Sequence, residues 1–380
     1  MAVLGGAGAM GRAVVFDLAQ AGHPVRILDT DRAAGERVGR RYGGRRTEVA
    51  TADAADPAAL AGKLGGAAVV INCAPYGLNL AVMEAALRAG CHYLDLGGLF
   101  HTTRQQLRRH GDFRRAGLLA VLGMGSAPGI ANVLARAAAD PLRRVRSVRV
   151  YNGGADFTSY ASPLPFAFSP ATVLDEFTLR PVIFAHGRFR SVPPLSGEED
   201  FRFELGTQRV RFSLHSEVAT LPLTYRQKGI RRCSFQIAYD PDLVSRLRLL
   251  IDLGLADARP GARGVAPRDV LLDCFRRLPP PPDVVDDRDT LAVVVDGEDD
   301  RGRLTVRYDL TARAQRRPPL SAVARDTGFA PAIVARMILD GRIEERGVRP
   351  PERCVPAREL LSALADRGMR ARRRMSRPRG

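Results

Sequence analysis

Short apolar runs separated by amphipathic segments dominate the first third of the chain. The run at residues 67–72 is almost continuously apolar, whereas the apolar side chains of residues 80–89 recur at helical spacing. Continuous short runs are typical of strands buried on both faces of a parallel sheet. We therefore predict strands at residues 2–4, 25–28, 46–50, 67–72, 93–96 and 118–122, with helices at 12–18, 33–42, 57–64 and 80–89. This alternation predicts an α/β domain with a doubly wound parallel sheet over residues 1–132.

The pattern changes after Asn132. Residues 148–151 and 231–239 alternate between apolar and polar side chains, and the segments 291–295 and 304–310 flank a polar turn, which predicts a hairpin. Helices are predicted at 241–253, 267–278, 320–325, 331–339 and 357–367. We expect a mixed α+β second domain at 133–315, C-terminal helices at 316–368 that return to the first domain, and an unstructured basic tail at 369–380.

Composition places the chain among ordinary globular proteins. It has 380 residues, of which 45% are hydrophobic and 26% charged, enough for two domains with sizeable cores. No apolar run is long enough to cross a bilayer, and the chain begins directly on a predicted strand, so we expect a cytoplasmic protein without a membrane partner. The five cysteines show no CxxC pairing, and no metal site is predicted.

The formal net charge of +17 raises the possibility of nucleic-acid binding. The excess is almost entirely arginine, since Lys63 and Lys228 are the only lysines, and the one dense run lies at residues 370–379. Alternating aromatic and basic residues, which suit base stacking, are absent from the sequence. A solvated basic tail is the favoured interpretation over a nucleic-acid contact, and no nucleic-acid partner is expected.

A glycine-rich turn follows the first strand. Gly6, Gly8 and Gly11 form GxGxxG between that strand and a helix, which is the arrangement that binds dinucleotides. Gly6 is expected to allow the tight turn, Gly8 the approach of a pyrophosphate, and Gly11 close packing of helix and strand. The second strand ends at Asp29, whose carboxylate suits a free ribose 2′-hydroxyl, so NAD is preferred, with NADP possible because Arg32 lies close by.

Three more loops are expected at the same edge of the sheet, because ligands bind beyond the carboxyl ends of parallel strands. They comprise residues 73–79, 95–98 and 123–129. Cys73 lies in the first of them, and we interpret it as a packing residue rather than a nucleophile. The predicted cofactor contacts are Gly6, Gly8, Ala9, Met10, Gly11, Asp29, Asp53, Cys73, Ala74, Pro75 and Gly97.

Motifs in three separate regions resemble the saccharopine dehydrogenase family. They are the glycine-rich start at residues 5–11, the segments 70–76, 92–98 and 127–132, and, farther along, 192–197, 215–222 and 341–352. The similarity extends over nearly the whole chain and is greatest to the branch of L-lysine 6-dehydrogenase and the glutamate-forming saccharopine reductases. The lysine and histidine pair of the lysine-forming members has no obvious match at Lys63 or Lys228.

The resemblance implies an N-terminal Rossmann domain and hydride transfer between a nicotinamide cofactor and a carbon–nitrogen bond of an amino acid. L-lysine or saccharopine is the expected substrate, and a homodimer or higher homo-oligomer is the expected assembly. The alternative is a catalytically inactive NAD(P)-binding or sensor protein of the same fold. A fold alone does not distinguish these two possibilities.

This chemistry needs a base, a partner for the substrate ammonium and a partner for its carboxylate. His215 is the predicted base and Glu217 the predicted ammonium partner, although a structural hydrogen-bonded pair is an equal alternative. Asp95 and Tyr76 are further catalytic candidates, with a turn cap and a packing role as the respective alternatives. The predicted substrate contacts are Asn79, Ser216, Thr220 and, for the carboxylate, Arg226, with Arg180 next.

Overall fold

A seven-stranded parallel sheet forms the first layer of the computed structural model, which describes residues 1–261 and 264–377. The strands, in their spatial order, are β17 (Gly347–Arg349), β6 (Leu119–Val121), β5 (His92–Asp95), β4 (Val69–Asn72), β1 (Ala2–Leu4), β2 (Val25–Asp29) and β3 (Thr47–Thr51). The order reverses between β1 and β4, so the carboxyl ends of these two strands border the crevice where ligands bind in such sheets. The doubly wound sheet is confirmed.

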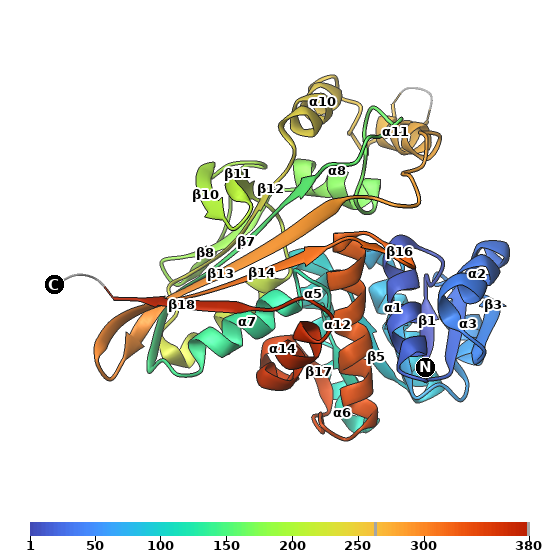
Figure 1. Cartoon of the computed structure of the whole chain (residues 1–380), viewed down its shortest axis with the longest axis horizontal. Coiled ribbons are helices and arrows are strands. Elements are labelled where there is room, and N and C mark those ends of the chain that lie inside the picture. The colour runs from blue at the N-terminus through green and yellow to red at the C-terminus, as the bar shows by residue number, and fades with distance from the viewer. Residues whose placement is uncertain (262–263, 378–380) are drawn as a thin grey trace.

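Both faces of this sheet are covered by helices, which explains the continuous apolar runs of its strands. The α1 (Ala9–Gln20) and α12 (Ala322–Leu339) helices pack together on one face, over Val3, Ile27 and Ile71. The other face is covered by α3 (Pro57–Leu64), α4 (Asn79–Ala89) and α6 (His110–Arg115). Figure 1 shows α12 beside α1, although more than 300 residues separate them in sequence. The predicted return of the C-terminal helices to the first domain is confirmed.

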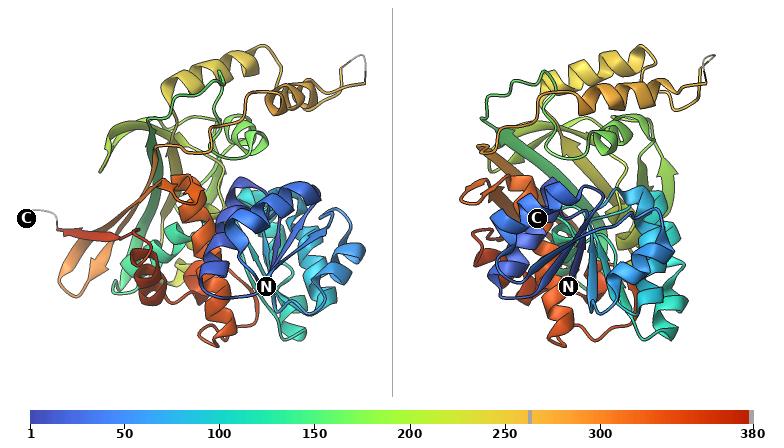
Figure 2. Two further views of the ribbon diagram at one scale, coloured as in Figure 1. Left: turned by 45° about the vertical axis from the view of Figure 1, so that its right-hand side comes forward. Right: turned by 90° about the vertical axis from the view of Figure 1, so that its right-hand side faces the viewer.

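A nine-stranded sheet forms the second layer (Figures 1 and 2). Its centre is β7 (Arg144–Asp156) between β12 (Arg232–Ala238) and the hairpin of β13 (Asp287–Asp299) and β14 (Gly302–Arg313), which confirms the predicted hairpin. The outer strands are β8 (Val182–Ala185), β9 (Arg188–Ser191), β10 (Glu199–Phe203), β11 (Gly206–Phe212) and β18 (Arg372–Ser376). The mixed second domain is therefore also confirmed.

Helices cover this second sheet and its outer end. The α7 (Ile130–Ala139) and α9 (Glu217–Thr224) helices contribute to the same core as the sheet. The α8 (Pro170–Thr178), α10 (Pro241–Asp252) and α11 (Pro267–Arg276) helices form a small apolar cluster of their own. The remaining elements are α2 (Arg32–Val38), α5 (Leu99–Leu107), α13 (Pro351–Cys354), α14 (Ala357–Ala365), the two-stranded ribbon β15 (Gln315–Arg316) and β16 (Pro319–Leu320), and three short helical turns at residues 39–43, 76–78 and 226–228.

Two predictions about the C-terminal part are wrong. Pro331 does not separate two helices, because α12 continues through it, with residues 328–335 buried against neighbouring elements. Burial of these residues stabilises the helix enough to compensate for the backbone hydrogen bond that proline cannot donate. Residues 372–376 are not an unstructured tail but strand β18, which pairs antiparallel with β14 while Met369 is fully buried. Among the described residues, no helix is both long and apolar enough to cross a membrane.

Candidate active site

The glycine-rich turn begins at the end of β1 and presses against the loop after β4. Gly5, not Gly6 as predicted, supplies the tight turn, because it has φ +70° and a Cβ there would lie 2.9 Å from the Ala74 nitrogen. Gly6 instead leaves room for Ile27, whose Cγ2 would lie 2.9 Å from a Cβ at that position. Gly11 packs against the Gly5 carbonyl and leaves no space for a side chain, as expected from close packing of helix and strand.

The start of α1 offers hydrogen-bond donors to a ligand. Among the described residues, no protein acceptor is found for the backbone N–H groups of Ala9, Met10 and Gly11. Gly8 precedes them and is exposed, with only the Gly5 oxygen within 4 Å of a Cβ built there. Free N–H groups at the positive end of a helix dipole bind phosphates, so this turn fits the diphosphate of a dinucleotide.

Asp29 lies beside the glycine turn at the end of β2. Its carboxylate accepts hydrogen bonds from the Ala7 N–H at 2.9 Å and the Asp31 N–H at 3.2 Å, and the residue remains partly exposed. Arg32 is directed to Glu36 at 3.0 Å. Asp53 is exposed and accepts a hydrogen bond from the Ala55 N–H within its own turn. Of the two acidic residues predicted to contact the cofactor, only Asp29 contacts the glycine turn.

A cavity of about 1540 Å³ lies between the two sheets. The first domain contributes Met10 of α1, and the segment 73–76, Gly97 and Pro128 from the loops of its sheet. The second domain contributes Gly153, Gly154, Glu176, His215, Phe235 and Tyr239. Of these loop residues, Cys73 is inert, because burial raises the pKa of its thiol to about 12. The cavity therefore adjoins both the predicted dinucleotide turn and the predicted base.

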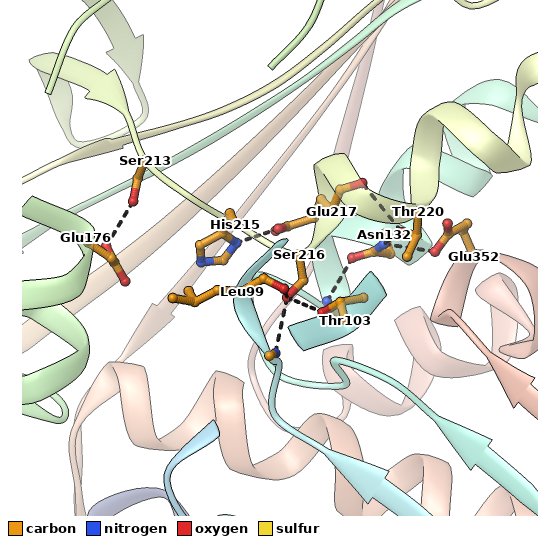
Figure 3. A network of polar contacts seen from close by, with 12 residues as sticks. Leu99, Thr103, Asn132, Glu176, Ser213, His215, Ser216, Glu217, Thr220 and Glu352 are labelled. Atoms are coloured by element: carbon orange, nitrogen blue, oxygen red, sulfur yellow. Dashed lines mark hydrogen bonds and ion pairs between the residues drawn. The ribbon is translucent and has the colours of Figure 1, made fainter. Parts of the chain in front are cut away.

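His215 lies in the wall of this cavity, between β11 and α9. Its ring stacks on Phe235 with centroids 3.7 Å apart, and its Nδ1 forms a hydrogen bond with the Glu217 carboxylate (Figure 3). Burial lowers the pKa of His215, but the negative charges of Glu217 and Glu176 outweigh it, so the pKa is raised above its ordinary value. A buried imidazole oriented by a carboxylate is suited to accept a proton through its other nitrogen.

The two glutamates near His215 occupy different positions. Glu217 is 0% exposed and does not line the cavity, so it cannot reach a substrate ammonium there, contrary to the predicted role. Glu176 does line the cavity, opposite Glu217 across the imidazole in Figure 3, and receives hydrogen bonds from Tyr239 and Ser213. Burial raises the pKa of Glu176. Sequence analysis missed this residue, whose signal was a carboxylate on the apolar face of α8, beside Val173 and Phe177.

Asp95 is not placed to contact a substrate. It is 1% exposed, and its carboxylate receives hydrogen bonds from Tyr93, Gln106 and the N–H groups of Gly97 and Gly123, at 2.6 to 2.9 Å. Burial raises the pKa of this carboxyl group. Because these bonds join the loops after β5 and β6, Asp95 holds the cavity wall in shape, in keeping with the predicted alternative of a turn cap.

The remaining polar candidates fall into two groups. Ser216 lines the cavity, but its hydroxyl oxygen is held by Gly98 N–H, Thr103 and the Leu99 carbonyl. Asn79 and Thr220 are buried away from the cavity, bonded to Gly97 and Asn132 respectively, so neither can contact substrate as predicted.

Tyr76 joins the two domains at the rim of the cavity. Its hydroxyl donates a hydrogen bond of 2.7 Å to Asp175 of α8, which also pairs with Arg268 at 2.6 Å. Burial and the Asp175 carboxylate raise the pKa of Tyr76. A phenol whose pKa is raised and whose proton is already donated to a carboxylate is poorly suited to acid–base chemistry near neutral pH. The position of Tyr76 therefore agrees with the predicted alternative, a packing residue in the cavity wall.

The arginine predicted to bind the substrate carboxylate does not line the cavity either. Arg226 is exposed and lies at a separate hollow, and Arg180 bonds Ser191, so neither lines the cavity. Arg211 of β11 does line it, opposite Ile237 in the pairing with β12 and on the same face as Phe235. Its guanidinium pairs with Glu198 at 2.7 Å. No signal in the sequence separates Arg211 from the many other arginines.

Neither lysine contributes to the cavity. Lys63 is exposed on α3, and Lys228 donates hydrogen bonds to the Ala139 and Asp140 carbonyls at the end of α7. Within the described parts of the chain, no group of His, Cys, Asp and Glu residues is arranged to hold a metal ion. The buried titratable groups that line the cavity include His215 and Glu176, together with Asp287 and Asp289 of β13.

Some known proteins are similar to this chain in sequence, and one solved structure is similar to it in fold. Carboxynorspermidine synthase of Vibrio alginolyticus is 25% identical over 204 residues, 50% of this chain and 48% of that protein. Carboxyaminopropylagmatine dehydrogenase of Synechocystis is 26% identical over 200 residues, 50% of this chain and 49% of that protein. The chain thus matches about half the length of these relatives. The apo saccharopine dehydrogenase (L-Glu forming) of Saccharomyces cerevisiae has the same fold, with a TM-score of 0.74 at 16% identity and 99% coverage of both chains.

Two family models together cover most of the chain. Residues 1–121 match the saccharopine dehydrogenase NADP binding domain, in agreement with the glycine turn and its free N–H groups, and the cofactor is NAD(P). Residues 125–369 match the saccharopine dehydrogenase C-terminal domain. The chain therefore belongs to the saccharopine dehydrogenase family.

Proposed function

We propose that this protein is an NAD(P)-dependent oxidoreductase that transfers hydride at a CH–NH bond of an amino acid, with L-lysine or saccharopine as the substrate. Family membership supports the reaction class. The names of the two relatives, carboxynorspermidine synthase and carboxyaminopropylagmatine dehydrogenase, indicate carboxyalkyl amines as the competing substrates. All of these molecules carry an amine and a carboxylate on a flexible chain.

The observation that carries the proposal is the position of His215. Its ring lines the cavity beside the dinucleotide turn, and Glu217 fixes its Nδ1 from behind. When bound, the nicotinamide accepts the hydride. His215 takes the proton of the substrate amine at Nε2, so that the nitrogen lone pair can assist departure of the hydride from the adjacent carbon.

Other cavity residues bind the ends of the substrate. Glu176 holds the ammonium group before proton transfer, because it lines the cavity beside His215. Arg211 exchanges its exposed partner Glu198 for the substrate carboxylate, to which its planar guanidinium can donate two hydrogen bonds. Asp95 positions the loops around the nicotinamide rather than touching substrate, and Asp29 favours NAD over NADP by hydrogen bonding the ribose hydroxyl.

The experiment is a nicotinamide reduction screen at alkaline pH, where the substrate amine is unprotonated. L-lysine, saccharopine and a carboxylated polyamine are each offered with NAD or NADP, and absorbance of the reduced coenzyme is followed. We expect turnover with lysine or saccharopine. Turnover confined to the polyamine would overturn the substrate assignment, and coenzyme-dependent thermal stabilisation without turnover of any amine would indicate a sensor instead of an enzyme.

His215→Ala tests the proposed base. At neutral pH, where the substrate amine still carries the proton that the base removes, we expect kcat to fall by about 10²–10⁴-fold, the usual contribution of a general base. His101→Ala is the matched control, because His101 is exposed on α5 and lies outside the cavity. Unchanged turnover of His215→Ala, with both variants melting like the parent protein, would remove His215 from the mechanism.

A further inference from the structure

A second hollow, of about 580 Å³, lies at the C-terminal end of α9. Pro222 and Leu223 of α9 form one wall, and Phe184 and Phe189 of the β8–β9 hairpin form another, with ring centroids 5.0 Å apart. None of the residues around this hollow also lines the larger cavity. It is therefore a separate site, although strand β7 contributes Arg144 and Arg146 to this hollow and Gly153 and Gly154 to the larger cavity.

Five arginines surround this hollow, which we call the arginine hollow: Arg144, Arg146, Arg188, Arg226 and Arg231. Arg146 is paired with Glu298. Within the part of the chain that the structure describes, the guanidinium groups of the other four form no ion pair, and no hydrogen bond from them is found. Among residues 1–261 and 264–377, no acidic side chain lines the hollow.

The clustering of these arginines destabilises the protein when no ligand is bound. Like charges within one hollow repel one another, and the donors of four guanidinium groups remain unused. Elsewhere, arginines such as Arg209, Arg268 and Arg307 pair with nearby carboxylates. An anion with several negative oxygens would remove the repulsion and receive paired hydrogen bonds from the planar guanidinium groups, which match phosphate geometry.

We propose that the arginine hollow binds a small phosphate-bearing polyanion. Its volume lies in the range of small-molecule sites, roughly 300–1,000 Å³. The two phenylalanines provide an apolar wall for the organic part of such a molecule. The arginines converge on one hollow from β7, β9 and the segments after α9, a geometry that fits a compact ligand better than an extended nucleic acid.

The proposal is tested by calorimetric titration of the full chain with inorganic tripolyphosphate. Saturating NAD and about 0.15 M salt are present, so that the glycine turn is occupied and weak surface binding is screened. We expect one tripolyphosphate per chain. Arg188→Ala combined with Arg231→Ala should weaken binding at least tenfold, and Arg226→Gln alone should weaken it measurably.

Arg353→Ala combined with Arg358→Ala is the matched control, because both arginines are exposed and lie outside the hollow. This variant should bind tripolyphosphate like the parent protein. Absence of heat, or equal weakening in the control, would overturn the proposal. Binding of duplex DNA with a steep salt dependence, without saturable tripolyphosphate binding, would also overturn it in favour of a nucleic-acid surface. If the double variant melts at lower temperature, Arg226→Gln provides the deciding measurement.

Discussion

At the residue scale, the sequence predicted that His215 and Glu217 act together, but it did not predict the position of Glu217 correctly. Two residues apart, they were predicted to act together, and their side chains are hydrogen bonded. The prediction assigned substrate binding to Glu217, but the chain turns into α9 at this residue and buries it. Glu176, 39 residues from His215 in sequence, occupies the cavity position instead.

Glu217→Gln should change the pH dependence of the reaction. The Glu217 charge contributes to the raised pKa of His215, so its removal lowers that pKa. The base must be neutral, and the rise of kcat/KM with pH should therefore begin at lower pH in the variant, while the maximal rate falls by about tenfold or more. Glu359→Gln, at an exposed position on α14, should leave the profile unchanged. An unshifted profile in Glu217→Gln would contradict the pairing in the active enzyme.

Asp29→Asn should alter the choice of coenzyme. The amide retains an acceptor for the Ala7 N–H but loses the charge that repels a 2′-phosphate. We expect the ratio of kcat/KM for NADP to that for NAD to rise by about tenfold, or about 1.4 kcal/mol. Asp53→Asn, at the exposed turn after β3, serves as the control. Equal ratios in all three proteins would show that Asp29 does not select the coenzyme.

At the element scale, the connection from β1 to α1 depends on close backbone packing. The glycines after β1 have distinct tasks: Gly5 adopts the positive φ, Gly6 accommodates Ile27, and Gly11 lies against the Gly5 carbonyl. The motif predicted the element and its ligand class because only glycine permits such close approach. It did not predict which glycine makes the turn, because that depends on how the loop after β4 packs against β1.

Gly11→Ala should therefore destabilise the protein by roughly 1–3 kcal/mol, the usual cost of overpacking, and weaken coenzyme binding. Urea unfolding and a coenzyme titration measure the two effects. Gly62→Ala is the control, because Gly62 is at an exposed position of helix α3, with no atom within 4 Å of where a Cβ would lie. That substitution should stabilise the protein by up to about 1 kcal/mol. Comparable stability of the two variants would contradict the packing argument.

At the scale of the whole molecule, the two sheets are joined by buried polar contacts as well as by apolar packing. Asp326 of α12 and Asp289 of β13 share a hydrogen bond, with Ser126 bonded to Asp326 at 3.0 Å and Asn152 to Asp289 at 3.1 Å. Burial, followed by the charge of Asp289, raises the pKa of Asp326 well above its ordinary value. Asp326, at the junction of the sheets, therefore retains its proton to higher pH than an exposed carboxyl group does.

This proton makes stability dependent on pH. The Asp326 pKa is higher in the folded than in the unfolded state, so the folded protein retains a proton that the unfolded chain releases above its ordinary pKa of 3.8. Stability consequently falls as pH rises above that value, until the folded group also ionises. Asp326→Asn should reduce this fall, as measured by melting temperature between pH 4 and pH 8. Asp366→Asn, at the exposed end of α14, should follow the parent protein, and a parallel curve for Asp326→Asn would contradict the raised pKa of Asp326.

The local pattern of the chain was sufficient to predict the doubly wound sheet, the β13–β14 hairpin and the dinucleotide turn. Alternation, apolar runs and glycine spacing act over a few residues, so they are visible in sequence. The cavity could not be predicted in this way, because its wall combines Met10 of α1 and the loop after β4 with α8, β11 and β12. Contacts between residues far apart in sequence also decided three other features. They allow α12 to continue through Pro331, and they pair residues 372–376 with β14 as strand β18. They also place Glu176 and Arg211, rather than Glu217 and Arg226, in the wall of the cavity that contains the predicted base.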